Sequence, residues 1–318
     1  MDFSDYKFRS SQSSKLNTGT IGLTDKQKVE MSLLMDEQAT GINANGNKIK
    51  WTPTKEEKLR HLLEVDKNKE LPKTMITELR KIHRSETYKR NFIFTNKYIQ
   101  KGISQEEESF SVYGEWLKKF KGFDGILINN KDRYENEFFT GESDSHDTFH
   151  KINKWGFDIK TSWDLDTFPF KEDGLNPDYY CQDQVYMNIS QTNKKLSPVD
   201  KWKTVYVLVN CTEQHLHSEK QKHYYASGAP SEETDEYFKW IETCKVIERM
   251  MIFDYDRFVE INPYHNLEYT REEWHGNGFD IPLEDRVLEF EVDYDQKFMD
   301  KLIERVKISR NYLNSLNK

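Results

Sequence analysis

The strongest constraint on the fold lies between residues 136 and 163, where two short runs rich in aromatic and apolar residues flank a polar stretch. The first run is NEFFTGESD (Asn136–Asp144) and the second is WGFDIKTSW (Trp155–Trp163). Short runs of this kind, bounded by Gly, Asp and Ser, are typical of β-strands. We therefore predict two neighbouring strands joined as a hairpin.

Elsewhere the chain alternates helical spacing with short apolar runs, which predicts a mixed α/β fold. We expect helices at Lys26–Glu37, Thr54–Val65, Pro72–Arg84, Glu106–Phe120, Pro177–Ile189, Glu232–Met251 and Asp295–Leu316. Further strands are expected at Thr204–Val209 and Arg286–Val292, and a long loop at Asn262–Asp280. Because residues 1–50 are rich in Ser, Asn, Gly and Thr, we predict an irregular and helical extension over residues 1–70, followed by one domain over residues 71–318.

The overall charge argues against a protein that coats nucleic acid by bulk electrostatics, because the formal net charge is -8. Any DNA contact must therefore be local. One segment could supply it, since residues 73–101 carry eight basic residues against two acidic ones. The basic residues are Lys73, Arg80, Lys81, Arg84, Lys89, Arg90, Lys97 and Lys101. A solvated helix face is the commoner role of such a charge run.

Cysteine usage and hydropathy place the chain among soluble cytoplasmic proteins. Cys181, Cys211 and Cys244 lie far apart without a CxxC pair, so neither a disulfide framework nor a zinc ribbon is expected. No apolar run reaches the length of a membrane span, and the first residues lack the apolar stretch of a secretory signal.

Histidines offer a weaker metal hypothesis. His146 and His150 have an HxxxH spacing that could bind zinc on a helix, but we expect a hairpin turn there. His215, His217 and His223 are spaced like a loose surface cluster.

Asp158-Ile159-Lys160 is the motif that carries chemistry. Strand alternation sends Asp158 and Lys160 to one face, while the Ile159 carbonyl can also face a metal. Asp144, at the end of the preceding predicted strand, would supply a second carboxylate. Hydrolysis of a phosphodiester needs a cation held by carboxylates and a group that activates water, so these residues together predict a magnesium-dependent nuclease site. The same Asp/Glu-x-Lys spacing at Glu56 and at Asp295 lies on predicted helices, where the two side chains would not share a face.

Two flanking features support this site. Tyr179, Gln182 and Tyr186 fall on one face of the helix after the lysine strand, where Gln182 could bond the metal-bound water, the lysine or a phosphate. Tyr179 and Tyr186 could equally be core residues. Upstream, Glu106 follows Lys101-Gly102 and begins a predicted helix, but Glu107 and Glu108 are alternatives that the sequence leaves open.

The order of these motifs resembles a known family. KG-x3-E, FTGESD, DIKTSW and YYCQDQVY are similar to the phage exonucleases of the lambda-exonuclease and RecB-like (YqaJ-like) branch of the PD-(D/E)XK superfamily. The resemblance runs from about Leu71 to the C-terminus. This resemblance implies that Glu106 occupies the family's first acidic position and that Asp144 is the Asp after the Gly-x-x turn. It likewise implies that Asp158 and Lys160 form the D-x-K pair, and that Gln182 and Tyr186 lie on the QxxxY helix.

This resemblance implies a restriction-endonuclease-like core, with a mixed central sheet flanked by helices. It implies Mg²⁺, for which Mn²⁺ can substitute, held by Asp144, Asp158, the Ile159 carbonyl and Glu106. It further implies resection of linear duplex DNA ends, 5′ to 3′, in phage replication or recombination, with a single-strand annealing protein and a homo-oligomer among the expected partners. The scattered cysteines predict no iron–sulfur cluster, unlike in some relatives.

The chain departs from the family at Asp183, where a Leu is expected, and at Lys171–Pro177, which lengthens the link before the glutamine helix. Two alternatives remain: a structure- or site-specific endonuclease on the same core, and a DNA-binding recombination protein without turnover.

Overall fold

The computed structural model describes residues 1–91, 95–261 and 269–317. Its strands are β1 (Phe8–Arg9), β2 (Tyr134–Glu135), β3 (Phe139–Gly141), β4 (Gly156–Thr161), β5 (Lys201–Val207) and β6 (Val287–Asp293). Its longer helices are α2 (Asp25–Thr40), α3 (Pro53–Asn68), α4 (Lys73–Tyr88), α6 (Glu106–Lys121), α8 (Pro177–Thr192), α9 (Glu213–Ala226), α10 (Asp235–Met251) and α13 (Gln296–Ser315). The shorter ones are α1 (Ser13–Leu16), α5 (Lys97–Ser104), α7 (Asp147–Asn153), α11 (Tyr255–Ile261) and α12 (Arg271–Gly276). Every predicted helix is present, and so are the strands predicted at Thr204 and Arg286.

The chain forms two compact units. The first comprises Met1–Phe8, Gln12–Phe92 and Asp300–Lys318, and the second comprises Arg9–Ser11 and Ile93–Met299. The predicted boundary at residue 70 rests on composition and stays a prediction. All residues of the predicted active site belong to the second unit.

The first unit is helical. Thr24 caps α2 through a capping box with Gln27, and Gly41 ends the helix in the left-handed conformation. The apolar faces of α2 and α3 meet in a small core of Leu23, Leu34, Leu59, Leu62 and Val65.

The second unit is built on a mixed three-stranded sheet of order β4-β5-β6. β4 pairs with β5 in parallel, and β5 pairs with β6 antiparallel. A second, smaller sheet has the order β1-β3-β2. The predicted mixed sheet flanked by helices is therefore confirmed.

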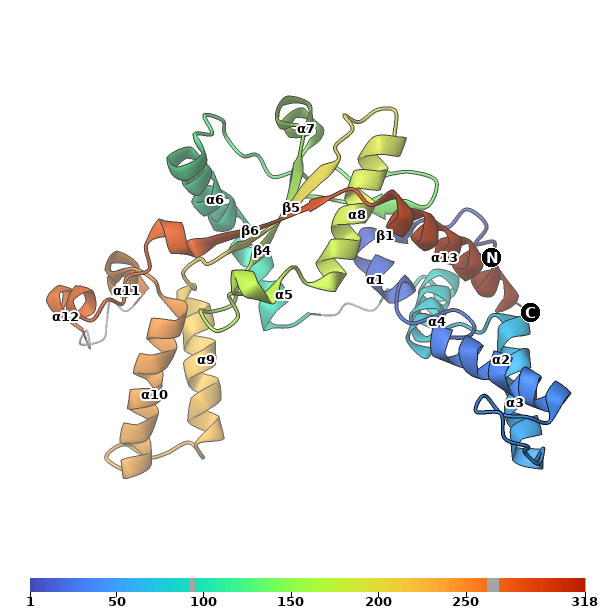
Figure 1. Ribbon diagram of the computed structural model, residues 1–318. Helices are drawn as coiled ribbons and strands as arrows, with labels where there is room; N and C mark the ends of the chain where they lie inside the picture. The colour runs from blue at the N-terminus through green and yellow to red at the C-terminus, as the bar shows by residue number, and fades with distance from the viewer. Residues whose placement is uncertain (92–94, 262–268, 318) are drawn as a thin grey trace. The chain divides into compact units, whose positions relative to one another are not determined.

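Helices α6 and α8 cover opposite faces of the larger sheet (Figure 1). α6 packs Tyr113 and Leu117 against Phe157 of β4 and against valines of β5. On the other face, α8 packs Tyr186 and Met187 around Trp202, the β5 partner of Gly156. A Cβ at Gly156 would overlap the Trp202 ring, so only glycine fits this register.

The predicted hairpin of Asn136–Asp144 and Trp155–Trp163 is wrong. β3 and β4 belong to different sheets, and α7 lies between them. His146 caps this helix, because its Nδ1 accepts the amides of Thr148 and Phe149 at 3.1 and 3.3 Å. His is not a common cap, which explains why the pattern did not indicate a helix here.

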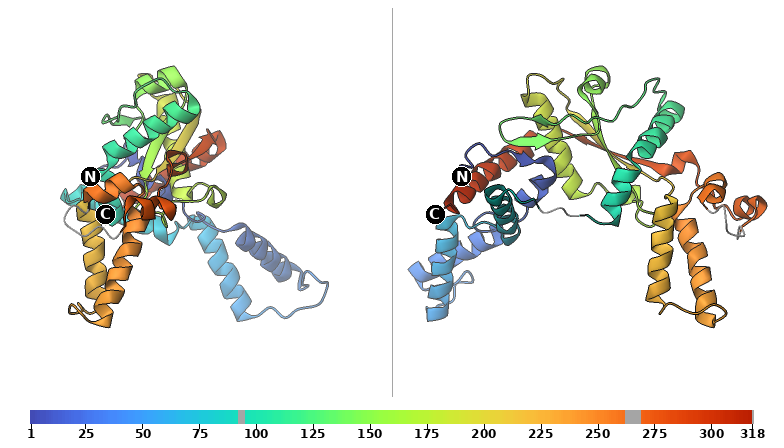
Figure 2. Two further views of the ribbon diagram at one scale, coloured as in Figure 1. Left: turned by 90° about the vertical axis from the view of Figure 1, so that its left-hand side faces the viewer. Right: turned by 180° about the vertical axis from the view of Figure 1, so that it is seen from behind.

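Other elements were not predicted. No helix was predicted at α5 or α9, and α12 lies in the predicted loop Asn262–Asp280, of which residues 262–268 are outside the described residues. α9 and α10 run side by side in both views of Figure 2. Among the described residues, no helix is long and apolar enough to cross a membrane.

Candidate active site

β4 places the D-x-K motif as its alternation predicts. Ile159 packs toward the core on the α6 face, so Asp158 and Lys160 point to the α8 face. Asp158 is 4% exposed and pairs directly with the Lys160 ammonium. Burial disfavours the charge of Lys160, but the Asp158 carboxylate outweighs burial and raises the pKa of Lys160 above its usual value. Lys160 therefore keeps its proton in this arrangement.

Asp144 reaches the site along the free edge of β4. The segment after β3 runs beside this edge, where the Ser145 amide donates to the Phe157 carbonyl at 3.3 Å. One residue earlier, the Asp144 carboxylate accepts the Ile159 amide at 2.5 Å and takes the place of a strand partner. Burial and the negative charge of Asp158 raise the pKa of Asp144 to about 8. The Asp144 carboxyl thus lies near a second acidic side chain, in surroundings that disfavour its own negative charge.

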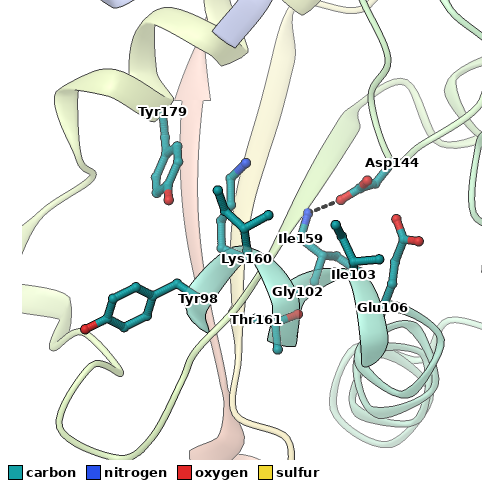
Figure 3. A pocket seen from close by; sticks show the side chains of 10 residues that line it. Tyr98, Gly102, Ile103, Glu106, Asp144, Ile159, Lys160, Thr161 and Tyr179 are labelled. Carbon is teal, nitrogen blue, oxygen red and sulfur yellow. Dashed lines mark hydrogen bonds between the residues drawn. The ribbon is translucent and has the colours of Figure 1, made fainter. Parts of the chain in front are cut away.

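Glu106, at the start of α6, stands on the same side of the pocket as Asp144 (Figure 3). Its carboxylate accepts the Lys131 ammonium at 2.7 Å. Of the three consecutive glutamates, Glu106 is the one that lines the pocket. Glu108 instead accepts the side-chain amide of Gln105 at 2.9 Å.

The predicted helix face of α8 meets the lysine. Gln182 Oε1 lies 3.5 Å from Lys160 Nζ, and Gln182 Nε2 donates to the Tyr186 hydroxyl at 2.7 Å. Tyr186 in turn donates to the Glu142 carbonyl at 2.9 Å. The Lys160 ammonium also lies 4.4 Å from the centroid of the Tyr179 ring. Gln182 and Tyr186 therefore tie α8 to the segment that carries Asp144.

Of these groups, Asp144, Glu106, Lys160 and Tyr179 line an open pocket of about 320 Å³. In Figure 3 the acidic side chains of Asp144 and Glu106 lie on one side, Tyr98 and Tyr179 lie on the other, and Lys160 lies between them. Helix α5, which the sequence did not predict, contributes the residues Tyr98, Ile99, Gly102 and Ile103 to the lining. The site is accessible to solvent and is large enough for a small ligand.

The residues present fit a magnesium ion better than a zinc ion. Mg²⁺ is often held by one or two carboxylates and keeps several waters, which suits Asp144, Asp158 and the Ile159 carbonyl. A bound cation would also offset the burial and the negative charge of Asp158 that raise the pKa of Asp144. No cluster of three His, Cys, Asp or Glu side chains suited to a metal occurs within residues 1–91, 95–261 and 269–317.

The HxxxH pair takes other roles. His146 caps α7, and His150 is buried with its Nε2 2.9 Å from the Ser145 hydroxyl. Burial lowers the pKa of His150 to about 4, so its ring is neutral. The three later histidines lie on α9, where His215 contacts the Trp163 ring at 5.5 Å between centroids.

The basic residues predicted between Lys73 and Lys101 do not all lie on an exposed surface. Lys101 is fully buried, and its ammonium donates to the carbonyls of Trp163 and Val209 at 2.8 and 2.9 Å. Lys97 pairs with Glu219 at 3.3 Å and lies over the Trp163 ring. Both residues belong to the second unit, whereas α4 belongs to the first. Lys101 in particular cannot contact a phosphate, because tertiary folding has enclosed it.

Asp183, which departs from the family pattern, does not displace Gln182. Its side chain is 1% exposed on the sheet side of α8 and accepts the Thr204 hydroxyl at 2.7 Å. Burial raises the pKa of Asp183 well above its usual value. Burial therefore disfavours the negative charge of this side chain.

Comparison with known proteins identifies the fold. No family model matches the sequence, and no curated protein matches it either. Among solved structures, a phage-related exonuclease from Haemophilus somnus 129PT matches with a TM-score of 0.55 and 20% sequence identity, over 98% of this chain and 95% of that one. The chain has the fold of a phage-related exonuclease.

An alkaline exonuclease (LHK-Exo) from Laribacter hongkongensis is a more distant match, with a TM-score of 0.43 and 9% identity over 98% of this chain and 90% of that one. The likeness to the Haemophilus protein spans both units and bears out the fold that the motifs predicted. At this level of identity it shows the fold alone, so the chemistry must be argued from the site.

Proposed function

We propose that this protein is a magnesium-dependent DNA exonuclease that hydrolyses linear DNA from its ends. The observation that carries the proposal is that Asp144 and Lys160 line one open pocket at the free edge of β4, while buried Asp158 pairs with Lys160 directly behind it. The fold shared with a phage-related exonuclease supports it. Action 5′ to 3′ on duplex ends, a role in phage recombination, a single-strand annealing partner and a homo-oligomer remain predictions from the family resemblance.

Each residue has a distinct role in this proposal. Asp144, Asp158 and the Ile159 carbonyl would hold Mg²⁺ or Mn²⁺, with Glu106 bound directly or through water. The cation would supply the charge that offsets the developing negative charge of the phosphate. Because Lys160 holds its proton beside Asp158, its ammonium would donate hydrogen bonds that orient water or a phosphate oxygen.

Gln182 and Tyr186 would keep the lysine in place from the α8 side. Exposed basic residues of α4 and of the segment just after it, among them Arg84 and Arg90, would contact the DNA backbone through phosphates.

Digestion of DNA with distinct ends tests the proposal. We expect the protein to degrade an end-labelled linear duplex with Mg²⁺, and to leave a covalently closed circle intact. Asp158→Ala should abolish degradation while the circular dichroism spectrum stays that of the folded protein. Cleavage of the closed circle would favour the endonuclease, and equal degradation by Asp158→Ala would remove the assignment of this site.

A further inference from the structure

Two buried polar side chains anchor the helical wall of the pocket. Lys101 and Gln105 lie one turn apart, and both point to the ends of the parallel strands β4 and β5. Lys101 bonds the carbonyls of Trp163 and Val209, each two residues beyond the end of its strand. Gln105 donates to the carbonyl of Asn210, the next residue along. Together they satisfy carbonyls that the sheet leaves free.

Burying a lysine here costs free energy that an apolar side chain of similar size would not cost. Lys101 is 0% exposed and, among the described residues, has no carboxylate within ion-pairing distance. A buried ammonium with no carboxylate in contact opposes folding, and burial lowers the pKa of Lys101 to about 8 despite the negative charges of Glu108 and Asp164. An apolar side chain would fill the same space without a charge. What it could not do is hold the two strand ends by hydrogen bonds.

The position of this anchor decides where the pocket residues lie. Gly102 and Ile103 follow Lys101 directly and line the pocket. Glu106 follows Gln105 directly and is the first residue of α6. A shift of α5 relative to the strand ends would therefore move Glu106 relative to Asp144, which is fixed separately on the β4 edge.

We propose that Lys101 and Gln105 are positioning residues, which set the Glu106 carboxylate for metal binding by tying it to the ends of β4 and β5. This inference rests on the metal site of the proposed function. It concerns residues outside the proposed ligand set, because the Lys101 ammonium and the Gln105 side-chain amide donate to the carbonyls of Trp163, Val209 and Asn210. Residues that orient metal ligands from behind typically change metal affinity 10–100-fold when replaced.

A double-mutant cycle tests it. Mn²⁺ binding is measured by calorimetry on the full chain for the wild type, Lys101→Met, Glu106→Gln and the double variant. We expect Lys101→Met to weaken Mn²⁺ binding about 10-fold. In the Glu106→Gln background the same change should weaken it less than about 2-fold, because the residue through which Lys101 acts is gone. Lys118→Met, the same substitution at an exposed position on α6, should leave binding unchanged.

The outcomes separate positioning from general destabilisation. Equal weakening by Lys101→Met with and without Glu106→Gln would overturn the proposal, and so would unchanged binding in a folded Lys101→Met protein. If Lys101→Met does not fold, Gln105→Leu replaces it in the same cycle, with the same two outcomes. A wild-type protein that binds Mn²⁺ through this coupling but does not cut DNA would refute the nuclease function and leave the positioning role standing.

Discussion

Two lysines withdrawn from solvent lie on neighbouring elements of the second unit, and their surroundings differ. On β4, Lys160 faces the carboxylate of Asp158, which raises its pKa. On α5, Lys101 faces two backbone carbonyls, and burial lowers its pKa to about 8. At the pocket, the lysine side chain thus keeps its charge. On α5, the same type of side chain holds two strand ends by hydrogen bonds, although burial of its charge opposes folding. Partners, and not residue type, decide the role.

The largest expected effect is on the rate of DNA cleavage, which should fall much further when Lys160 is replaced than when Lys101 is replaced. Lys160→Met should lower the rate of DNA cleavage about 10²–10³-fold, because it removes a preorganised donor from the reacting centre. Lys101→Met should lower the rate at saturating Mn²⁺ by less than about 3-fold, since it acts on metal affinity. Single-turnover digestion across a range of Mn²⁺ concentrations measures both. Equal losses at saturating metal would erase the distinction.

The next effect separates them by pH. The pKa of Lys101 falls from 10.5 in the unfolded chain to about 8 in the folded protein. Between these values the unfolded chain keeps a proton that the folded protein has lost, so this group makes folding more favourable as pH rises from 8 to 10.5. Below the lower value its contribution is constant. The gain amounts to roughly 3 kcal/mol.

Urea unfolding of the wild type and Lys101→Met over this pH range checks that sign. The difference in unfolding free energy between the two proteins should change with pH in favour of the wild type, and parallel curves would show that Lys101 is not titrating. Other groups titrate equally in both proteins and cancel.

A smaller effect sharpens the Lys160 side. Gln182 joins Lys160 to Tyr186, so Gln182→Leu should free the lysine and lower the cleavage rate about 10-fold. Tyr186→Phe removes the hydroxyl that donates to the Glu142 carbonyl, so it tests the same link from its other end. A cleavage rate equal to the wild type in both variants would show that α8 does not position Lys160.

The smallest effect concerns a third buried ionisable group. Because burial raises the pKa of Asp183 and so favours its neutral form, we expect Asp183→Asn to change the unfolding free energy at pH 7 by less than about 1 kcal/mol. A charged Asp183 would instead give a large change that varies with pH. Thermal unfolding of the two proteins at pH 5 and pH 8 distinguishes these cases.

The sequence predicted the parts that depend on local periodicity. Alternation along β4 was enough to put Asp158 and Lys160 on one face, and helical spacing put Gln182 beside Tyr186. The hairpin was wrong because Asp144 pairs with the β4 edge through its side chain, while α7 begins at an uncommon His cap.

The helical wall of the pocket depends on tertiary contacts and could not be predicted in this way. The sequence around Lys101 is that of a surface lysine in a basic run. Its burial depends on the ends of β4 and β5, which are distant in sequence. Gln105 carries no local signal either. One clue was present, since Lys101 is itself the lysine of the KG-x3-E motif, and Gln105 follows it at helical spacing and directly precedes Glu106.

The most direct test of the central claim is to locate the metal. Fe²⁺ replaces Mg²⁺ in the purified protein, and ascorbate with peroxide then generates radicals that cut the backbone beside the bound ion. The account predicts cuts next to Asp144 and at Asp158–Lys160, suppressed by excess Mg²⁺ and absent in Asp158→Asn. Cuts elsewhere, or the same cuts in Asp158→Asn, would contradict it.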